Sequence, residues 1–238
     1  MKNLLIIGAG GFGREVLMMA IDNPSYGVDW VIKGYLDSRS DVLDAFSKDS
    51  NLLPDSMDYS PEKRERYNRN YPIFGDPLSY EPQADDVFIC AVGAPAERRK
   101  YAEPLITKGA QFIRLVHPLS AISTFAEIGA GSIIGAYASM SPDSKIGRHV
   151  SISSYTAIAH DVNIEDWVEI GAHCLVAGSV NVASGARIHP GSVITPKSRI
   201  GENAVVAAGS VVFKHVAANT TVMGNPARKF DWKPDAAA

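Results

Sequence analysis

Aliphatic residues recur at every sixth position through the second half of the chain. Four residues after each of them stands a small or β-branched residue, and no insertion interrupts the register. A period of six fits neither the 3.6-residue repeat of a helix nor the alternation of an ordinary strand. It predicts a parallel β-helix with three short strands in each coil of eighteen residues. The aliphatic positions are Val116, Ile122, Ile128, Ile134, Met140, Ile146, Ile152, Ile158, Ile164, Ile170, Val176, Val182, Ile188, Ile194, Ile200, Val206 and Val212.

Residues eighteen apart should stack in such a coil. Ile128, Ile146, Ile164, Val182 and Ile200 are expected along one interior edge, with neighbouring rungs ~4.8 Å apart. The aliphatic side chains fill the interior, and the small residues fit where the strands bend. The repeat therefore predicts a rigid rod of nearly six coils, each burying its face against the next.

Residues 1–112 follow a different pattern, in which apolar strands alternate with helices. The strands are LLIIGAG, VIKGYLD and DVFICAVG, and the helices are REVLMMAID and APAERRKYAEPLITKG. This alternation predicts a small parallel α/β sheet. Residues 38–71 are polar and charged, and a loop of that length is often functional or mobile. We therefore expect an α/β domain at 1–112, a β-helix at 113–222 and a C-terminal tail at 223–238.

Composition narrows the class of protein. The chain has 238 residues, 46% hydrophobic and 21% charged, with a formal net charge of −3. No basic footprint for nucleic acid is present, and no apolar run approaches the ~20 residues of a membrane span. The N-terminal LLII favours a buried strand over a signal peptide, because glycines follow it without a cleavage signature. Two distant cysteines suit a reducing cytoplasm.

A glycine loop follows the first strand. Gly8, Gly10 and Gly13 form G-x-G-x-x-G before a helix, where backbone N–H groups favour phosphate. Asp37, at the end of the second strand, could bind a ribose hydroxyl. A domain of this size is about half a full dinucleotide fold, which disfavours NAD. A mononucleotide or nucleotide-sugar site fits best, and glycines that only tighten a turn are the structural alternative.

A histidine and an aspartate stand side by side within the repeat, at His160 and Asp161. Neighbouring side chains on a strand point to opposite faces, so the two can meet only in a turn. Gly178 lies one coil later and should occupy the adjacent rung. General base, orienting carboxylate and oxyanion donor are the parts of direct acyl transfer. A plain surface pair is the alternative.

The other histidines within the repeat occupy non-aliphatic positions. A solvated turn is the expected setting for all of them. They are His149, His173, His189 and His215.

These motifs together resemble one family. LLIIGAGGFGRE, GYLD, VHPLSAIS, the repeat itself, AIAHDV and GNPAR are similar to hexapeptide-repeat acyltransferases with an N-terminal Rossmann-like domain. That group includes sialic acid O-acetyltransferases and N-acetyltransferases of nucleotide-linked amino sugars. The resemblance implies a left-handed β-helix, a homotrimer in the cytoplasm and acetyl-CoA bound between neighbouring β-helices. No metal site is expected, because the cysteines and histidines match no metal-binding spacing.

The resemblance also implies roles for individual residues. His160 matches the general base, Asp161 its partner and Gly178 the oxyanion donor. Many members carry a second histidine near the acceptor group, nine residues after the base, and this chain has Glu169 there. The resemblance therefore implies that Glu169 lies at the substrate-binding site. The other matching positions are Pro190 and Ala208 in the acetyl-CoA groove and Gly10, Gly11, Gly13 and Asp37 at the nucleotide-sugar end.

The sequence thus favours an acetyl-CoA-dependent N-acetyltransferase of a nucleotide-linked amino sugar. O-acetylation of a sialic-acid-type sugar needs the same parts and stays open. A zinc-dependent β-helix carbonic anhydrase would need three histidine ligands, and the histidine separations here do not repeat. A nucleotide sensor without catalysis would bind nucleotide without acetyl-CoA turnover.

Overall fold

The computed structural model describes residues 1–38 and 71–230. The chain divides into two compact units, Met1–Leu115 and Val116–Ala238. Most of the polar segment predicted as a loop, residues 39–70, and the last part of the expected tail, residues 231–238, lie outside the described residues. Each unit is described by itself below.

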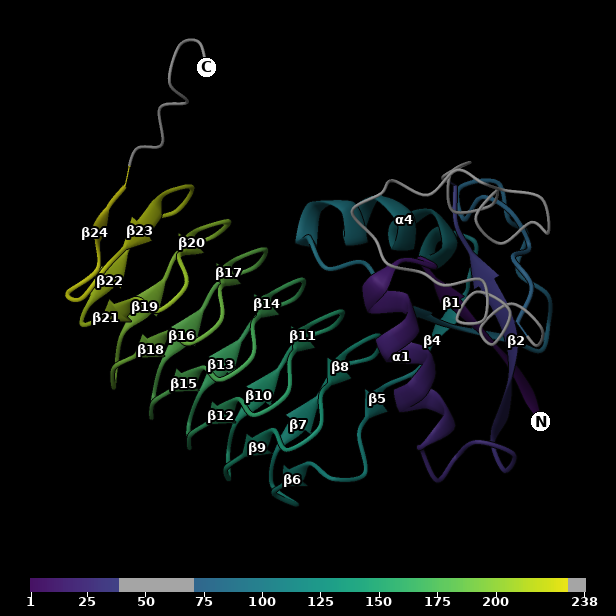
Figure 1. The fold of residues 1–238 in the computed structure, drawn as a ribbon, viewed down its shortest axis with the longest axis horizontal. Helices are drawn as coiled ribbons and strands as arrows, with labels where there is room; N and C mark the ends of the chain where they lie inside the picture. The colour runs from purple at the N-terminus through teal and green to yellow at the C-terminus, as the bar shows by residue number, and fades with distance from the viewer. Residues whose placement is uncertain (39–70, 231–238) are drawn as a thin grey trace, which may run out of the picture. The chain divides into compact units, whose positions relative to one another are not determined.

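The N-terminal unit contains a four-stranded parallel sheet in the order β2-β1-β3-β4 (Figure 1). Helix α1 follows β1, and helix α4 connects β3 to β4. This arrangement confirms the predicted α/β class, although the short strand β4 was not anticipated. The elements are β1 (Lys2–Ile7), α1 (Gly11–Ile21), β2 (Trp30–Leu36), β3 (Asp86–Cys90), α4 (Pro95–Thr107) and β4 (Gln111–Phe112).

The apolar run of β1 explains its central place. Leu4, Leu5 and Ile6 are all fully buried, as expected for a strand that has neighbours on both edges and is covered on both faces. On the described part of this sheet, the order places β2 on one side of β1 and β3 on the other. The chain therefore adds β2 on one side of β1 and the later strands on the other side, so the sheet has a topological switch point between β1 and β3. In open α/β sheets, ligands bind at such a point.

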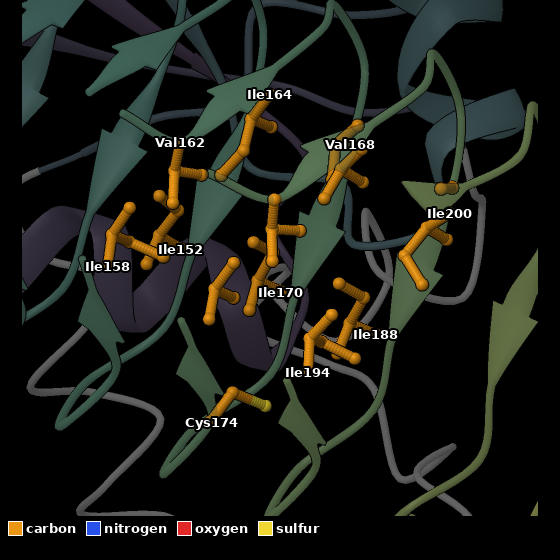
Figure 2. Close-up of a cluster of buried hydrophobic side chains, with 14 of the residues drawn as sticks. Ile152, Ile158, Val162, Ile164, Val168, Ile170, Cys174, Ile188, Ile194 and Ile200 are labelled. Carbon is orange, nitrogen blue, oxygen red and sulfur yellow. The ribbon is translucent and has the colours of Figure 1, made fainter. Parts of the chain in front are cut away.

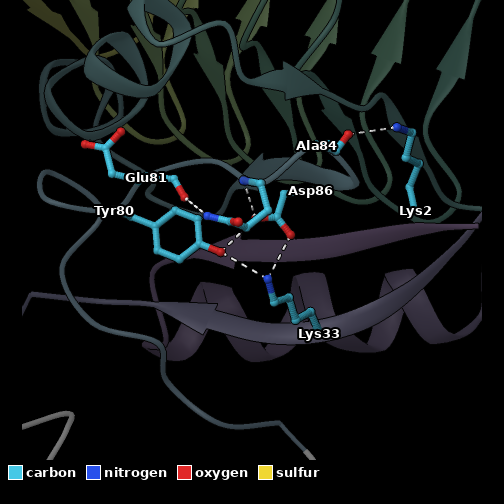
Figure 3. Close-up of polar contacts among 7 residues, drawn as sticks. Lys2, Lys33, Tyr80, Glu81, Ala84 and Asp86 are labelled. Atoms are coloured by element: carbon cyan, nitrogen blue, oxygen red, sulfur yellow. Dashed lines mark hydrogen bonds and ion pairs between the residues drawn. The ribbon is translucent and has the colours of Figure 1, made fainter.

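A polar network ties the two strands that flank β1 (Figure 3). The Lys33 ammonium on β2 donates to Asp86 Oδ1 on β3 at 2.9 Å, and the Tyr80 hydroxyl donates to Asp86 Oδ2 at 2.7 Å. Burial alone would raise the pKa of Asp86, but these hydrogen bonds outweigh it and hold the pKa below its usual value. The buried carboxylate is thus ionised and satisfied, as a buried charge must be.

The second unit is the parallel β-helix that the six-residue period predicted. Its rungs form three sheets (Figure 1), which we call the first, second and third sheets in the order the chain meets them. The first sheet contains β5 (Leu115–Val116), β8 (Ile133–Ile134), β11 (Ser151–Ile152), β14 (Glu169–Ile170), β17 (Arg187–Ile188), β20 (Val205–Val206), β23 (Thr221–Met223) and β24 (Arg228–Lys229). The second contains β6 (Ala121–Ile122), β9 (Ser139–Met140), β12 (Ala157–Ile158), β15 (Leu175–Val176), β18 (Val193–Ile194) and β21 (Val211–Val212). The third contains β7 (Glu127–Ile128), β10 (Lys145–Ile146), β13 (Asn163–Ile164), β16 (Asn181–Val182), β19 (Arg199–Ile200) and β22 (His215–Val216).

The interior of the β-helix is a stack of aliphatic side chains (Figure 2). From β7 to β19 of the third sheet, each rung pairs in register with the rung eighteen residues later, as predicted for Ile128, Ile146, Ile164, Val182 and Ile200. From Ser132 onward, the small residues at the bends are buried. Their polar atoms are satisfied, since Ser132 Oγ donates to the Gly147 carbonyl at 2.8 Å and accepts from the Val150 N–H at 3.0 Å.

The turns carry rings in two stacks. Tyr137, Tyr155 and His173 stack with ring centroids 4.9 Å apart along the turns between the first and second sheets. His149 and Trp167 stack at 4.3 Å in the turns between the third and first sheets. The solvated setting expected for His149 is wrong, because the residue is 4% exposed and its ring packs flat against Trp167.

The repeat changes near its end. The step from Val212 to Val216 is two residues short of six, and Val222 restores the spacing. Strand β23 then pairs antiparallel with β24. This hairpin covers part of the last coil with backbone hydrogen bonds, which blunts an otherwise open strand edge.

Candidate active site

His160 and Asp161 occupy the turn between β12 and β13, where the second sheet meets the third. His160 Nδ1 lies 2.7 Å from Asp161 Oδ2, and the two side chains are 66% and 59% exposed. Asp161 has a φ of 57°, so the backbone turns sharply enough for adjacent side chains to meet. A hydrogen on Nδ1 donated to Asp161 leaves Nε2 as the proton acceptor.

Gly178 lies directly against the His160 ring from the next coil. The N–H of Ser179 donates to the His160 carbonyl at 3.0 Å, which fixes the two turns against each other. A Cβ built on Gly178 would lie 2.8 Å from His160 Nε2 and Cε1, closer than real Cβ atoms come. Since Gly178 does not have a positive φ, the glycine is required by the imidazole and not by the backbone.

The amide of Gly178 has no acceptor among the described residues. Within residues 1–38 and 71–230, the amides of Ala177 and Ser179 on either side donate to Ile194 and His160, while the Gly178 N–H donates to nothing. Because Gly178 has no side chain of its own and is only partly buried, this N–H can donate to a ligand oxygen. A proton-accepting imidazole and a hydrogen-bond-donating amide therefore lie next to each other, on stacked turns between the second and third sheets. Acyl transfer to a nucleophile requires both groups.

Pro190 and Ala208 stand in a different column. They occupy successive turns between the first and second sheets. The turn of His160 and the turns stacked on it join the second and third sheets. The two stacks of turns therefore border opposite edges of the second sheet. The fold does not bring Pro190 or Ala208 onto the His160 turn of the same chain.

Glu169 lies on β14 of the first sheet and is engaged by a residue that the sequence analysis missed. Arg187, directly opposite on β17, donates from Nε to Glu169 Oε2 at 2.7 Å. The repeat period itself contains the signal, because Arg187 follows Glu169 by one coil of eighteen residues.

A cavity of about 300 Å³ opens in the N-terminal unit at the carboxyl ends of β1, β2 and β3. This is the switch point of the sheet. It brings together three of the four residues assigned to the nucleotide-sugar end. The lining includes Gly8, Gly10, Gly11, Leu36, Asp37, Ser38, Val92, Glu97 and Tyr101.

Asp37 and Gly13 shape this cavity in different ways. Asp37 is 5% exposed, and its Oδ2 accepts the Ala9 N–H at 2.7 Å, which fastens the glycine loop to the end of β2. Gly13 does not line the cavity. A side chain there would collide with the Gly8 carbonyl, so Gly13 allows α1 to approach β1 closely.

Three polar lining residues were not identified from the sequence. Ser38 Oγ lies 3.3 Å from the Tyr101 hydroxyl, and Glu97 stands one turn before Tyr101 on α4. The four-residue spacing of Glu97 and Tyr101 places both on one helix face. That spacing could have indicated a polar face turned to the strand ends.

Neither cysteine has the character of a nucleophile. Burial raises the pKa of Cys90 to about 12, and burial also raises the pKa of Cys174. Both thiols stay protonated near neutral pH, and the reactive species is the thiolate. In the described part of the chain, no group of three or more His, Cys, Asp and Glu side chains is arranged to hold a metal ion, and no helix there is long and apolar enough to cross a bilayer.

Two family models match the chain. Residues 3–105 match the PglD N-terminal domain, and residues 143–178 and 179–214 match the bacterial transferase hexapeptide, each with six repeats. The chain therefore combines a segment that matches the PglD N-terminal domain with repeats that match the bacterial transferase hexapeptide. This confirms the family indicated by the motifs. None of the curated proteins matches the sequence.

Solved structures with both units are similar over almost their whole length. A mutant of perosamine N-acetyltransferase from Caulobacter crescentus, in complex with CoA and GDP-perosamine, is 20% identical with a TM-score of 0.77, covering 97% of this chain and 98% of that one. The acetyltransferase domain of PglB from Neisseria gonorrhoeae, in complex with acetyl coenzyme A, is 22% identical with a TM-score of 0.75, covering 96% and 99%. WeeI from Acinetobacter baumannii is 24% identical with a TM-score of 0.74, covering 97% and 100%. At these identities the likeness establishes the two-unit fold.

Proposed function

We propose that this transferase is an acetyl-CoA-dependent N-acetyltransferase that acts on an amino group of a nucleotide-linked sugar. The observation that carries the proposal is the His160–Asp161 pair at 2.7 Å with Gly178 against the imidazole. The chemistry of the similar proteins supports it, since two of them are acetyltransferases solved with CoA or acetyl coenzyme A and one also holds an amino sugar on GDP.

The proposed reaction is a direct transfer. The sugar nitrogen attacks the thioester carbonyl carbon, and His160 Nε2 takes the proton that the nitrogen loses. Asp161 stabilises the resulting imidazolium, and the Gly178 N–H donates to the oxyanion of the tetrahedral intermediate. The C–S bond then breaks, the thiolate of CoA leaves and accepts a proton, and an amide remains on the sugar. No acyl-enzyme forms, in keeping with the protonated, buried cysteines.

The nucleotide is assigned to the cavity of the N-terminal unit. The first turn of α1 contains Gly11 and no acidic residue, so its open N–H groups favour phosphate. Asp37 and the Ser38–Tyr101 pair supply polar groups for the nucleoside. The cavity lies within one unit and is large enough for part of a nucleotide.

A homotrimer is part of the proposal. The outward positions of the second sheet carry no charge, whereas those of the third sheet carry mostly charged and amide side chains. An uncharged sheet face suits contact with another copy of the chain. The second-sheet positions are Ala121, Ser139, Ala157, Leu175, Val193 and Val211, and the third-sheet positions are Glu127, Lys145, Asn163, Asn181, Arg199 and His215.

Thiol release from acetyl-CoA tests the proposed function. The purified protein is supplied with UDP-, dTDP-, GDP- and CMP-linked sugars, each with and without a free amine. Release with an amino sugar alone, together with an amide product in the mass spectrum, is the expected result. Release with a hydroxyl sugar alone would move the assignment to O-acetylation.

Two further results would contradict the proposal more deeply. Nucleotide binding without thiol release on any acceptor would favour the non-catalytic sensor. Bicarbonate formation that depends on added zinc would favour the carbonic anhydrase.

A further inference from the structure

The cavity at the strand ends of the N-terminal unit has an uneven distribution of charge. Its described lining contains two carboxylates, Asp37 and Glu97, and no lysine, arginine or histidine. Asp37 is 5% exposed and already accepts the Ala9 N–H, whereas Glu97 is an exposed residue of α4. The space beside these carboxylates therefore favours a group that donates hydrogen bonds and disfavours a second anion.

The two helices that begin at this cavity differ in their first turns. Helix α1 starts at Gly11, has no acidic residue in its first turn and has no side-chain cap. Helix α4 starts at Pro95, which has no N–H, and places Glu97 in its first turn. Phosphate is therefore favoured at α1 and disfavoured at α4. A ligand that fits this cavity is anionic at one end and rich in hydrogen-bond donors at the other.

The carboxylate of Glu97 can accept from such donors. Lys100 Nζ lies 3.5 Å from Glu97 Oε2, and both side chains are about half exposed. An ion pair that is long and exposed contributes little, so a better-placed donor can replace it. Tyr101, one turn after Glu97 on the same helix face, has its hydroxyl 3.3 Å from Ser38 Oγ. The α4 side of the cavity thus offers a carboxylate and a hydroxyl to one ligand.

The nucleobases differ in the donors that they present to a carboxylate. Guanine has two adjacent donors, N1–H and the N2 amino group, which match the two oxygens of a carboxylate. Cytosine and adenine have one amino donor beside a ring nitrogen that accepts. Uracil and thymine have a single N–H between two carbonyl oxygens, which a carboxylate repels. Guanine is therefore the base that can pair with both carboxylate oxygens at once.

We propose that this cavity recognises a guanine base and that Glu97 is the residue that determines this specificity. The inference rests on the proposed function and names its substrate class, a GDP-linked amino sugar. The two oxygens of Glu97 accept from N1–H and from the N2 amino group, and the Tyr101 hydroxyl donates to O6. The diphosphate lies at the first turn of α1.

Titration calorimetry on the full chain, without acetyl-CoA and without a sugar, tests the base contact. GDP should bind roughly 10- to 100-fold more tightly than inosine diphosphate, which lacks only the N2 amino group. GDP should also bind more tightly than UDP and CDP. Equal affinities for GDP and inosine diphosphate, or tighter binding of UDP than of GDP, would overturn the assignment of guanine.

The variant Glu97→Gln should change which base the cavity prefers. Its amide has one acceptor and one donor, so it matches xanthine, in which a carbonyl oxygen replaces the N2 amino group. The variant should lose about 10-fold in affinity for GDP and gain about 10-fold for xanthosine diphosphate. A gain in affinity cannot come from misfolding. An unchanged ratio of the two affinities would overturn the role of Glu97.

Glu103 provides a matched control on the same helix. It pairs with Arg99 at 3.0 Å and does not line the cavity. Glu103→Gln should leave every nucleotide affinity within about twofold of wild type, because salt screens an exposed charge that the ligand does not touch. An equal loss of GDP preference in this variant would assign the effect to the charge of α4 as a whole and would overturn the direct contact with Glu97.

Calorimetry and thiol release together separate the base contact from the proposed function. A guanine preference without acetyl transfer to any amino sugar would support the base contact and refute the proposed function. Acetyl transfer that requires a UDP-, dTDP- or CMP-linked amino sugar would support the proposed function and overturn the assignment of guanine. Failure of every nucleotide to bind would contradict both.

Discussion

Two histidines of the same repeat, His149 and His160, occupy turns of the same β-helix and have opposite surroundings. The His149 ring is buried and stacks on Trp167 at 4.3 Å with an interplanar angle of 5°. The His160 side chain is 66% exposed and pairs with Asp161. The first ring fills space in a corner, and the second presents a titratable nitrogen to a ligand.

Both rings lie against a glycine one coil away, so this spacing does not separate them. A Cβ on Gly131 would collide with the His149 ring, as one on Gly178 would with the His160 ring. What differs is the side of the ring away from the glycine. Trp167 covers His149, whereas nothing among the described residues covers His160 in the same way. A histidine and a glycine one coil apart therefore indicate close packing. The exposure of the imidazole ring decides whether that histidine can also take part in chemistry.

The largest difference is expected from removing the exposed ring. His160→Ala should reduce kcat by about 100- to 10,000-fold, the usual contribution of a general base. The melting temperature should change little, because an exposed side chain contributes little to packing. Thiol-release kinetics and thermal unfolding on the same sample check this. Wild-type turnover in the variant would remove His160 from the mechanism.

Gly178→Ala is expected to have the next largest effect. The added methyl group displaces the His160 ring and crowds the amide, so kcat should fall by about 10- to 100-fold. If the methyl acts through the imidazole, the double variant with His160→Ala should be no slower than His160→Ala alone. Additive losses in that cycle would mean that the methyl acts elsewhere.

The buried histidine should show the reverse pattern. His149→Ala removes a packed ring and one half of a stack, so the free energy of unfolding should fall by about 2 kcal/mol. Turnover at a temperature where the variant is folded should stay within about threefold of wild type. Denaturant titration and thiol release measure the two quantities. A stable but inactive variant would contradict the structural role assigned to His149.

A smaller effect on the free energy of unfolding is expected at Asp166, next to the stack of His149 and Trp167. Asp166 accepts from the Arg148 N–H at 2.7 Å and from its guanidinium at 2.8 Å. Burial alone would raise the pKa of Asp166, but these contacts lower it overall. The stabilisation is present above the ordinary value of 3.8 and is lost as the pH falls through the lower folded value.

The variant Asp166→Asn tests this at two pH values. The pair is partly exposed, so the variant should lose no more than about 1 kcal/mol of unfolding free energy at pH 7. The difference from wild type should disappear near pH 2, where both proteins lack the charge. Denaturant unfolding measures both, and a difference that persists in acid would assign the effect to packing instead.

The sequence by itself determined the coil. Hydrophobic side chains every six residues can be buried together only if the chain turns after each short strand. Because no insertion breaks the register, each position has one stacking partner on the next coil. The same reasoning placed Gly178 beside His160, because eighteen residues make one coil. In the first half, strand and helix patterns were sufficient to give the α/β class and the strand ends where the cavity lies.

Only the tertiary structure decided which turns are covered and which sides face each other. Burial of His149 depends on the ring of Trp167 eighteen residues later, and the period alone does not fix how two rings orient. The pairing of Arg187 with Glu169 needed the register of β14 with β17. The opposition of the first sheet to the His160 turn follows from closing the coil into a prism. A periodic sequence specifies neighbours along the coil axis, whereas the sides of the prism, and what lies across it, exist only once the chain has closed.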